Sequence, residues 1–274
     1  MNISLDEQYK RLEQTRMLLN PRIVPIKKES IRKYFREFNN IDLANLEKKM
    51  KRNIILYRAP LIQIHGSNMV NWTTNIGDEI YIDLEFLTKR ENDDIIKQQL
   101  THEIMHSLCR KDDKKMLFGH IIDNNNSYLK GINEAVTQVF TDDIEGKVLE
   151  EKDDYLYFVK NIVRILKNSL DVSLLANQYL NNNIAFEDKF NEISDDNFNG
   201  FARVINEIYL LSKKKYYFSI DESAENDLIA NQKLILEFIN VFIEKVSNND
   251  LNVLEKIKKD FNNKDFLKNI NILN

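Results

Sequence analysis

Apolar residues recur at three- and four-residue spacing along most of the chain, which is the pattern of amphipathic helices. Near the start this spacing covers residues 5–19 and 28–52, with Pro21 and Pro25 interrupting the chain between them. From residue 151 to residue 274 it is almost continuous, and we expect no strand there. The clearest helical stretches of this region are 155–166, 197–211, 227–246 and 251–266. The sequence therefore predicts N-terminal helices and a mainly α-helical C-terminal part.

The spacing changes after residue 53, where short runs of β-branched and aromatic residues replace the helical pattern. The last of these runs alternates between apolar and polar residues, as a strand with one solvent-exposed face does. The runs are 54–57, 61–65 and 79–84, and the turn-forming residues between them are 66–68 and 75–78. We expect these residues to form a small mixed sheet.

A helix is predicted directly after the sheet, because residues 92–118 contain no glycine or proline and apolar residues again recur at helical spacing. Asn92 and the two aspartates after it are candidates for its N-cap and first turn. A second helix is predicted at 130–143. The fold class is therefore α+β, with a small mixed sheet packed on the first of these helices. The expected divisions are N-terminal helices at 1–52, a core at 53–150 and a helical subdomain at 151–274.

The composition is that of an ordinary globular protein, with 43% hydrophobic and 30% charged residues in a chain of 274. A formal charge of −4 shows no basic excess, so we expect no nucleic-acid partner. The N-terminus lacks the pattern of a secretory signal, and no run of about 18 apolar residues occurs. A single cysteine, Cys109, fits a reducing compartment. We therefore expect a cytoplasmic protein without a membrane span; its oligomeric state is not indicated.

Basic residues alternate with apolar ones between Ile26 and Phe38. Such a segment could contact an anionic membrane or a nucleic acid. The narrow apolar stripe, which includes Ile31 and Phe35, favours an amphipathic helix whose apolar face docks on the protein's own core.

Residues 102–106 read His-Glu-Ile-Met-His, and this is the most informative stretch of the chain. On a helix, residues four apart share one face, so His102 and His106 can bind one metal ion from the same side. Glu103 then lies beside the remaining coordination position, where it could accept a proton from a bound water. The pattern predicts a catalytic zinc site.

Catalytic zinc commonly has three protein ligands, so a third is expected downstream. Glu134 is the favoured candidate, because it lies near the start of the second predicted helix, which could pack beside the first. Asp112 and His120 remain alternatives. Cys109 falls on the metal-bearing face as well, but a lone cysteine is more commonly a small buried apolar residue.

These residues resemble the gluzincin group of zinc metallopeptidases, in which the same five-residue motif is followed on a second helix by a ligand glutamate within Asn-Glu-Ala. Residues 133–135 match that second pattern. The resemblance implies Zn²⁺ bound by His102, His106 and Glu134, with Glu103 as the catalytic base. It extends over residues 50–145 in layout and over a few residues in detail.

Two features depart from the thermolysin-like pattern. Thermolysin-like sequences carry an aspartate four residues after the ligand glutamate, and Gln138 occupies that position here. A glutamine can accept a hydrogen bond from a ligand imidazole, but it lacks the charge that raises ligand basicity. The interval from His106 to Glu134 is also longer, so the connecting loop must differ.

The expected function is therefore zinc-dependent hydrolysis of peptide bonds, in which Glu103 activates a zinc-bound water and the substrate is a peptide or protein. The alternative is a non-catalytic interaction or regulatory protein that keeps a zincin scaffold. Three residues are candidates to stabilise the oxyanion: Tyr155, Tyr157 and His120. If the sheet edge pairs with an extended substrate, residues 79–85 are the expected substrate-lining strand.

Overall fold

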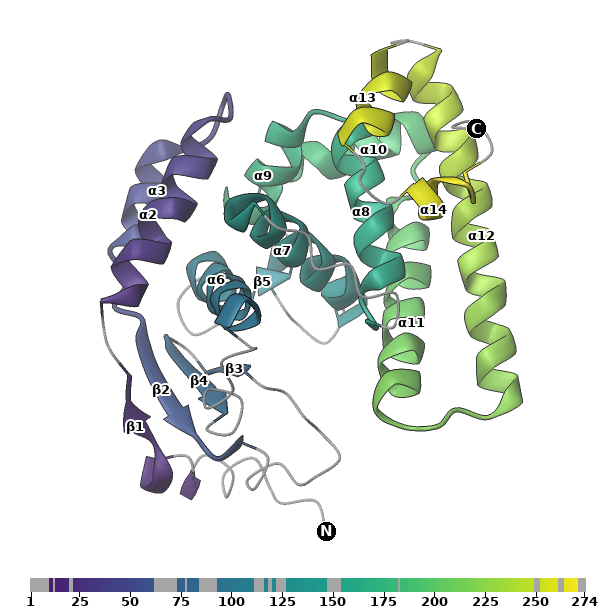
Figure 1. Ribbon diagram of the computed structural model, residues 1–274. Helices are drawn as coiled ribbons and strands as arrows, with labels where there is room; N and C mark the ends of the chain where they lie inside the picture. The colour runs from purple at the N-terminus through teal and green to yellow at the C-terminus, as the bar shows by residue number, and fades with distance from the viewer. Residues whose placement is uncertain are drawn as a thin grey trace. The chain divides into compact units, whose positions relative to one another are not determined.

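The computed structural model groups the chain into two compact units (Figure 1). The first unit consists of residues 1–37, 43–113 and 141–147, and the second of residues 38–42, 114–140 and 148–274. The described residues are 10–11, 13–19, 22–61, 73–76, 78–83, 93–110, 116–117, 120–121, 127–146, 154–181, 183–248, 252–260 and 264–270.

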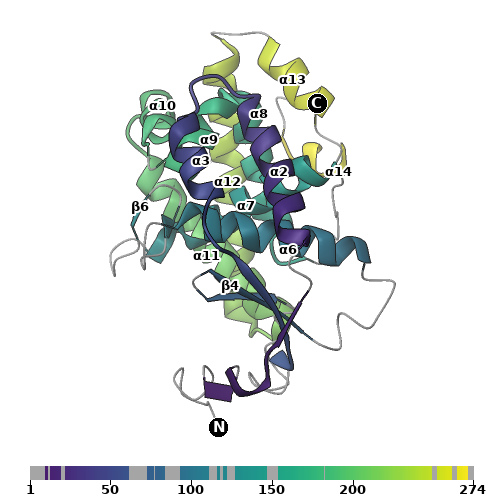
Figure 2. The same cartoon turned by 90° about the vertical axis from the view of Figure 1, so that its left-hand side faces the viewer.

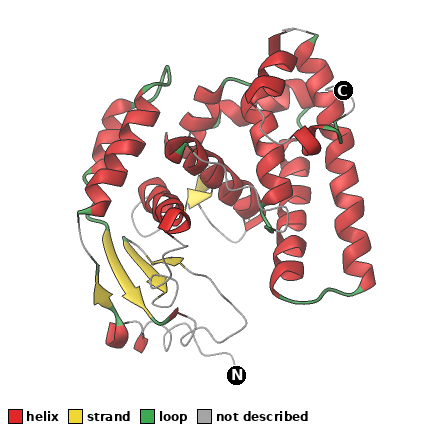
Figure 3. Ribbon diagram, viewed as in Figure 1, coloured by secondary structure: helices red, strands yellow, loops and turns green. Residues whose placement is uncertain are grey.

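The first unit contains a mixed four-stranded sheet with strand order β1-β2-β4-β3. Strand β2 (Ile55–Ala59) runs parallel to β4 (Glu79–Asp83), and β1 (Met17–Leu18) and β3 (Thr73–Ile76) flank them in antiparallel pairs. Tyr57 lies opposite Tyr81 in the parallel register, and their rings stack with centroids 5.4 Å apart. The yellow arrows of Figure 3 show the sheet at the lower left.

Helix α6 (Asp93–Cys109) is the central helix of the first unit and carries the His-Glu-Ile-Met-His motif. It packs against α2 (Ile23–Arg36), α3 (Leu43–Met50) and strand β3. Its apolar side chains are almost completely buried; they include Leu100, Ile104, Met105 and Leu108. The predicted amphipathic segment is α2, whose Ile31 and Phe35 are fully buried, so the prediction that its apolar face docks on the core is confirmed.

The last turn of α7 (Lys130–Glu145) belongs to the first unit and is bonded to both α2 and α6. The buried Lys27 ammonium donates to both carboxylate oxygens of Glu145, at 2.6 and 2.7 Å. The hydroxyl of Thr101, beside His102 on α6, donates to the same carboxylate at 2.5 Å. Tyr34 adds a bond from α2 to Asp143 at 2.6 Å. These bonds hold the last turn of α7 against α2 and α6.

Helices make up most of the described part of the second unit. Its longest elements are α11 (Phe198–Tyr217) and α12 (Glu222–Ser247), which pack side by side as a hairpin (Figures 1 and 2). The remaining helices are α8 (Tyr157–Ser169), α9 (Val172–Asn181), α10 (Ala185–Ser194), α13 (Asn252–Asp260) and α14 (Lys264–Leu267). The turn η2 (Ser127–Leu129) leads into α7, and β5 (Met116–Leu117) pairs with β6 (His120–Ile121).

A cluster of phenylalanines joins α10, α11 and α12 in the second unit. The ring of Phe190 lies 4.9 Å from that of Phe242 and 5.0 Å from that of Phe201, measured between centroids. Aromatic residues bury a large apolar area, so this cluster stabilises the packing of the three helices. No helix in the described part of the chain is both long and apolar enough to cross a membrane.

The predicted α+β class agrees with this architecture in general terms, since a small mixed sheet accompanies mainly helical structure. The helices predicted at 130–143 and over most of the C-terminal part are confirmed where the structure describes them. The strands predicted at 54–57 and 79–84 correspond to β2 and β4. The strand predicted at 61–65 lies outside the described residues, apart from Leu61.

Four local predictions are wrong. The helix expected over 5–19 does not reach its predicted end, because Met17 and Leu18 form strand β1 instead. Pro25 does not break the chain but is the third residue of α2, where a missing N–H has no carbonyl to bond in any case. The helix expected over 28–52 is divided, because Asn40 adopts a left-handed conformation with φ of 63°. Strand β4 is not an edge of the sheet, because β3 pairs with its far side. The turn predicted at 75–78 overlaps the last two residues of β3.

The Lys27–Glu145 pair leads to a prediction about stability. Lys27→Met leaves the half-buried Glu145 carboxylate without its cation, so we expect the free energy of unfolding to fall by up to about 3 kcal/mol. Urea denaturation followed by circular dichroism measures it. Lys33→Met on the exposed side of α2 is the matched control and should change stability by about 0.5 kcal/mol or less. A Lys27→Met variant as stable as this control would contradict the prediction.

Candidate metal centre

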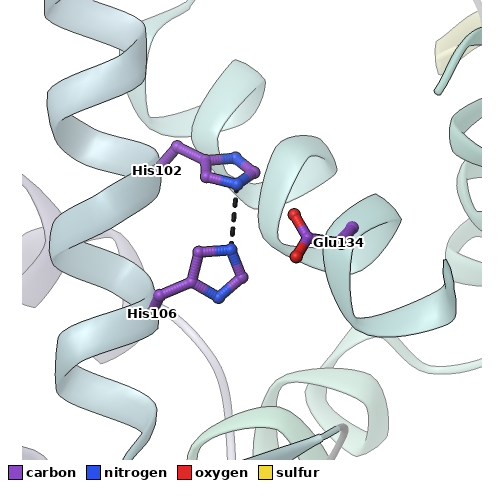
Figure 4. Close-up of side chains that lie close together, drawn as sticks. All are labelled: His102, His106 and Glu134. Carbon is purple, nitrogen blue, oxygen red and sulfur yellow. Dashed lines mark hydrogen bonds between the residues drawn. The ribbon is translucent and has the colours of Figure 1, made fainter. Parts of the chain in front are cut away.

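Helix α6 places His102 and His106 on one face, one turn apart (Figure 4). Their Nε2 atoms are 2.9 Å apart, and the ring centroids are 4.6 Å apart. His102 is buried and His106 is half-buried. The two Nε2 atoms are thus within hydrogen-bond distance of each other, and both rings lie on the same helix face, from which they could bind one ion.

Glu134, from the first half of α7, directs its carboxylate toward the two rings (Figure 4). One donor atom from each of the three residues lies within 4.8 Å of the other two. The donor atoms of the three residues predicted as ligands therefore lie close to one another.

The chemistry of these donors fits zinc. Two imidazole nitrogens and one carboxylate oxygen form a common catalytic zinc set, which leaves a fourth position open. Two nitrogens bound to a tetrahedral zinc at its usual bond length are about 3.3 Å apart, close to the 2.9 Å between these Nε2 atoms. Of the alternative ligands, Asp112 lies outside the described residues, and only the backbone of His120 is described.

Glu103 is buried and bonded to the sheet. The hydroxyl of Thr73, on β3, lies 2.8 Å from its Oε1 and donates to it. The same hydroxyl is 3.0 Å from the side-chain oxygen of Gln99. A hydroxyl has only one proton to donate, and Glu103 receives it. The Gln99 amide is therefore assigned with its NH₂ group toward Thr73, so that it donates to the hydroxyl oxygen. Strand β3 thus orients the carboxylate beside the two histidines. The sequence pattern does not indicate this contact, because β3 lies outside the strands that the pattern predicts.

Two tyrosines surround Glu134 within the second unit. Burial raises the pKa of the Tyr155 phenol well above its usual value, and the negative charge of Glu134 adds to this effect. Burial and then Glu134 also raise the pKa of Tyr209. The two rings are 5.8 Å apart, centroid to centroid. Both phenols therefore keep their protons and can donate hydrogen bonds.

Lys213 is the basic residue beside this pair. Its ammonium lies 5.4 Å from the ring centroid of Tyr155 and donates to the Tyr209 hydroxyl at 3.4 Å. Burial and the charge of Lys130 lower the pKa of Lys213, while Glu134 acts in the opposite direction. Its ammonium is therefore largely removed from water.

Packing or burial describes three other residues that were considered for the site. Tyr157 packs edge-on against Phe266, with centroids 6.0 Å apart. Cys109 is buried at the end of α6 and is not among the metal-holding group found in the described residues, which agrees with its interpretation as a small apolar residue. Gln138 is also buried, on α7.

The metal-binding prediction is tested by measuring zinc content with mass spectrometry. We expect about one zinc per wild-type chain, lost in His102→Ala and Glu134→Ala, because two remaining ligands hold the ion weakly. Glu237→Ala, at an exposed position of α12, is the control and should keep its zinc. Loss in His102→Ala but not in Glu134→Ala would move the third ligand to Asp112 or His120. A folded wild type that takes up no added zinc would contradict the site.

No family model matches this chain, and neither the curated proteins nor the solved structures include a significant match to it. The resemblance to gluzincins consequently depends on residues 102–106 and 133–135 alone.

Proposed function

We propose that this protein is a zinc-dependent metallopeptidase that hydrolyses peptide bonds in a peptide or protein substrate. The observation that carries the proposal is the convergence of His102, His106 and Glu134, whose donor atoms lie within 4.8 Å of one another. Glu103 follows the first ligand directly, which is where a metallopeptidase has its general base.

His102, His106 and Glu134 would hold the ion and leave one coordination position for water or substrate. When bound, zinc supplies a Lewis acid that would polarise a carbonyl and lower the pKa of water to near neutrality. Two neutral imidazoles and one carboxylate would neutralise only part of the Zn²⁺ charge. The remaining positive charge would favour binding of a carbonyl oxygen.

Glu103 acts as the proton carrier in this proposal. It accepts a proton from the attacking water and delivers it to the amine that leaves when the peptide bond breaks. The Thr73 hydroxyl donates to Oε1 of its carboxylate at 2.8 Å, which fixes the direction of the carboxylate. A fixed carboxylate loses little entropy in the reaction, which is a recognised source of catalytic rate.

Tyr155 is the proposed donor to the oxyanion, in preference to Tyr157 and His120. Its phenol lies within electrostatic reach of Glu134 and keeps its proton because burial raises its pKa. A donor aimed at developing negative charge stabilises the transition state more than the ground state. Tyr157 packs instead against Phe266, and the side chain of His120 is outside the described part.

An extended substrate would pair with β3 rather than with β4, which corrects the expectation for residues 79–85. Strand β4 already has partners on both sides. Among the described strands, β3 pairs with β4 alone and forms an edge of the sheet. Main-chain hydrogen bonds along a free sheet edge are a common way to bind an extended peptide. Thr73 on this strand contacts Glu103, so a peptide bound there would lie beside the proposed base.

The catalytic role of Glu103 is tested with Glu103→Gln. Loss of the proton carrier should lower peptide turnover by roughly 10²–10⁴-fold while zinc content and fold are unchanged. A fluorogenic peptide library assayed with each purified protein measures turnover. Glu244→Gln, exposed on α12, controls for the loss of a carboxylate. Turnover retained by Glu103→Gln would contradict the mechanism, and zinc binding without turnover in the wild type would favour the non-catalytic scaffold.

The role of Tyr155 is tested with Tyr155→Phe, which keeps the ring and its contact with Tyr209 but removes the phenol. We expect kcat to fall roughly 10²–10³-fold, because an oxyanion donor acts mainly in the transition state, while KM changes little. Tyr157→Phe is the matched control and should retain kcat. A larger loss in Tyr157→Phe than in Tyr155→Phe would reverse the assignment.

A further inference from the structure

The first turn of α7, which carries Glu134, is bonded to α11. The first N–H groups of a helix have no carbonyl partner within the helix and need one from elsewhere. Gly131, the second residue of α7, donates its N–H to Oδ1 of Asn206 at 3.1 Å. Asn206 is half-buried on α11, so this bond is partly protected from water.

Glycine at position 131 lets the two helices approach unusually closely. A Cβ added there would lie 2.9 Å from Cβ of Tyr209, 3.1 Å from Cα of Asn206 and 3.2 Å from the carbonyl oxygen of Ile205. The last two atoms belong to the backbone of α11 and cannot rotate away. The backbone of α7 is therefore in direct contact with α11 at this turn.

The turn before α7 is held by the same face of α11. The Tyr128 hydroxyl donates to Asn199 at 2.9 Å, and the Arg203 guanidinium lies 4.4 Å from the centroid of the Tyr128 ring. Asn199, Arg203 and Asn206 are four and three residues apart, so they form one stripe along α11. This stripe contacts the chain at η2 and again at the first turn of α7.

Glu134 follows Gly131 by three residues, which places both on the same face of α7, about 4.5 Å apart along the axis. A shift or rotation of α7 at Gly131 would therefore move the Glu134 carboxylate by a similar amount. A metal ligand tolerates little displacement, because bond lengths at zinc vary by about 0.2 Å.

We propose that Asn206 is a positioning residue for the metal ligand Glu134, acting through its hydrogen bond to the Gly131 N–H. This proposal rests on the proposed metal site. It adds that α11, in the helical C-terminal part, sets the position of the proposed third ligand. Asn206 itself touches neither metal nor substrate.

Asn206→Ala removes the acceptor and should weaken zinc binding by about tenfold or more, as loss of a group that orients a ligand commonly does. Competition with a chromogenic chelator measures the affinity. The visible spectrum of the Co²⁺-substituted protein reports ligand geometry and should change in the same variant. Asn206→Asp keeps an oxygen acceptor at the same place and should restore both signals. Glu207→Ala, the exposed neighbour on α11, is the matched control.

Hydrogen exchange gives a readout that needs no metal, because the Gly131 amide should exchange faster in Asn206→Ala than in wild type or Asn206→Asp. If the alanine variant does not fold, Asn206→Gln tests the same point, since it keeps the amide but moves the acceptor by one methylene. Zinc affinity and Co²⁺ spectrum unchanged in a folded Asn206→Ala or Asn206→Gln would overturn this proposal alone. A wild type that binds no zinc would overturn it together with the proposed function.

Discussion

The ion pair between Lys27 and Glu145 is the interaction on which the packing around the motif helix in the first unit depends. The Glu145 carboxylate receives hydrogen bonds from Lys27 on α2 and Thr101 on α6, and Thr101 is the residue before His102. A carboxylate removed from water is stable only with such partners. Meeting this requirement holds the last turn of α7 against α2 and α6 within the first unit.

The polar residues around the motif have separable roles in the proposed site. His102, His106 and Glu134 supply the donor atoms, whereas Thr73 fixes the direction of the Glu103 carboxylate. Reaction at the open coordination position needs a base in a fixed place more than it needs a strong base. The hydrogen bond from β3 provides this, so the sheet contributes to the proposed chemistry as well as to the fold.

The helical residues around Glu134 form an environment of low polarity with a few hydrogen-bond donors. Tyr155, Tyr209 and Lys213 are all partly withdrawn from water, and in each case burial is the largest cause of the pKa shift. Electrostatic interactions are stronger in such surroundings than in water. A carboxylate ligand there would bind a cation more tightly, and a phenol there would donate more effectively to a developing oxyanion.

The sequence by itself determined the motif helix, the second helix with its glutamate, and the mainly helical C-terminal part, because helical spacing and metal-ligand spacing are local properties. Only the tertiary structure decided which strand forms the sheet edge and which residues orient the site. The bond from Thr73 to Glu103 and that from Gly131 to Asn206 join residues 30 and 75 positions apart. Such contacts depend on packing between elements, which no local pattern encodes.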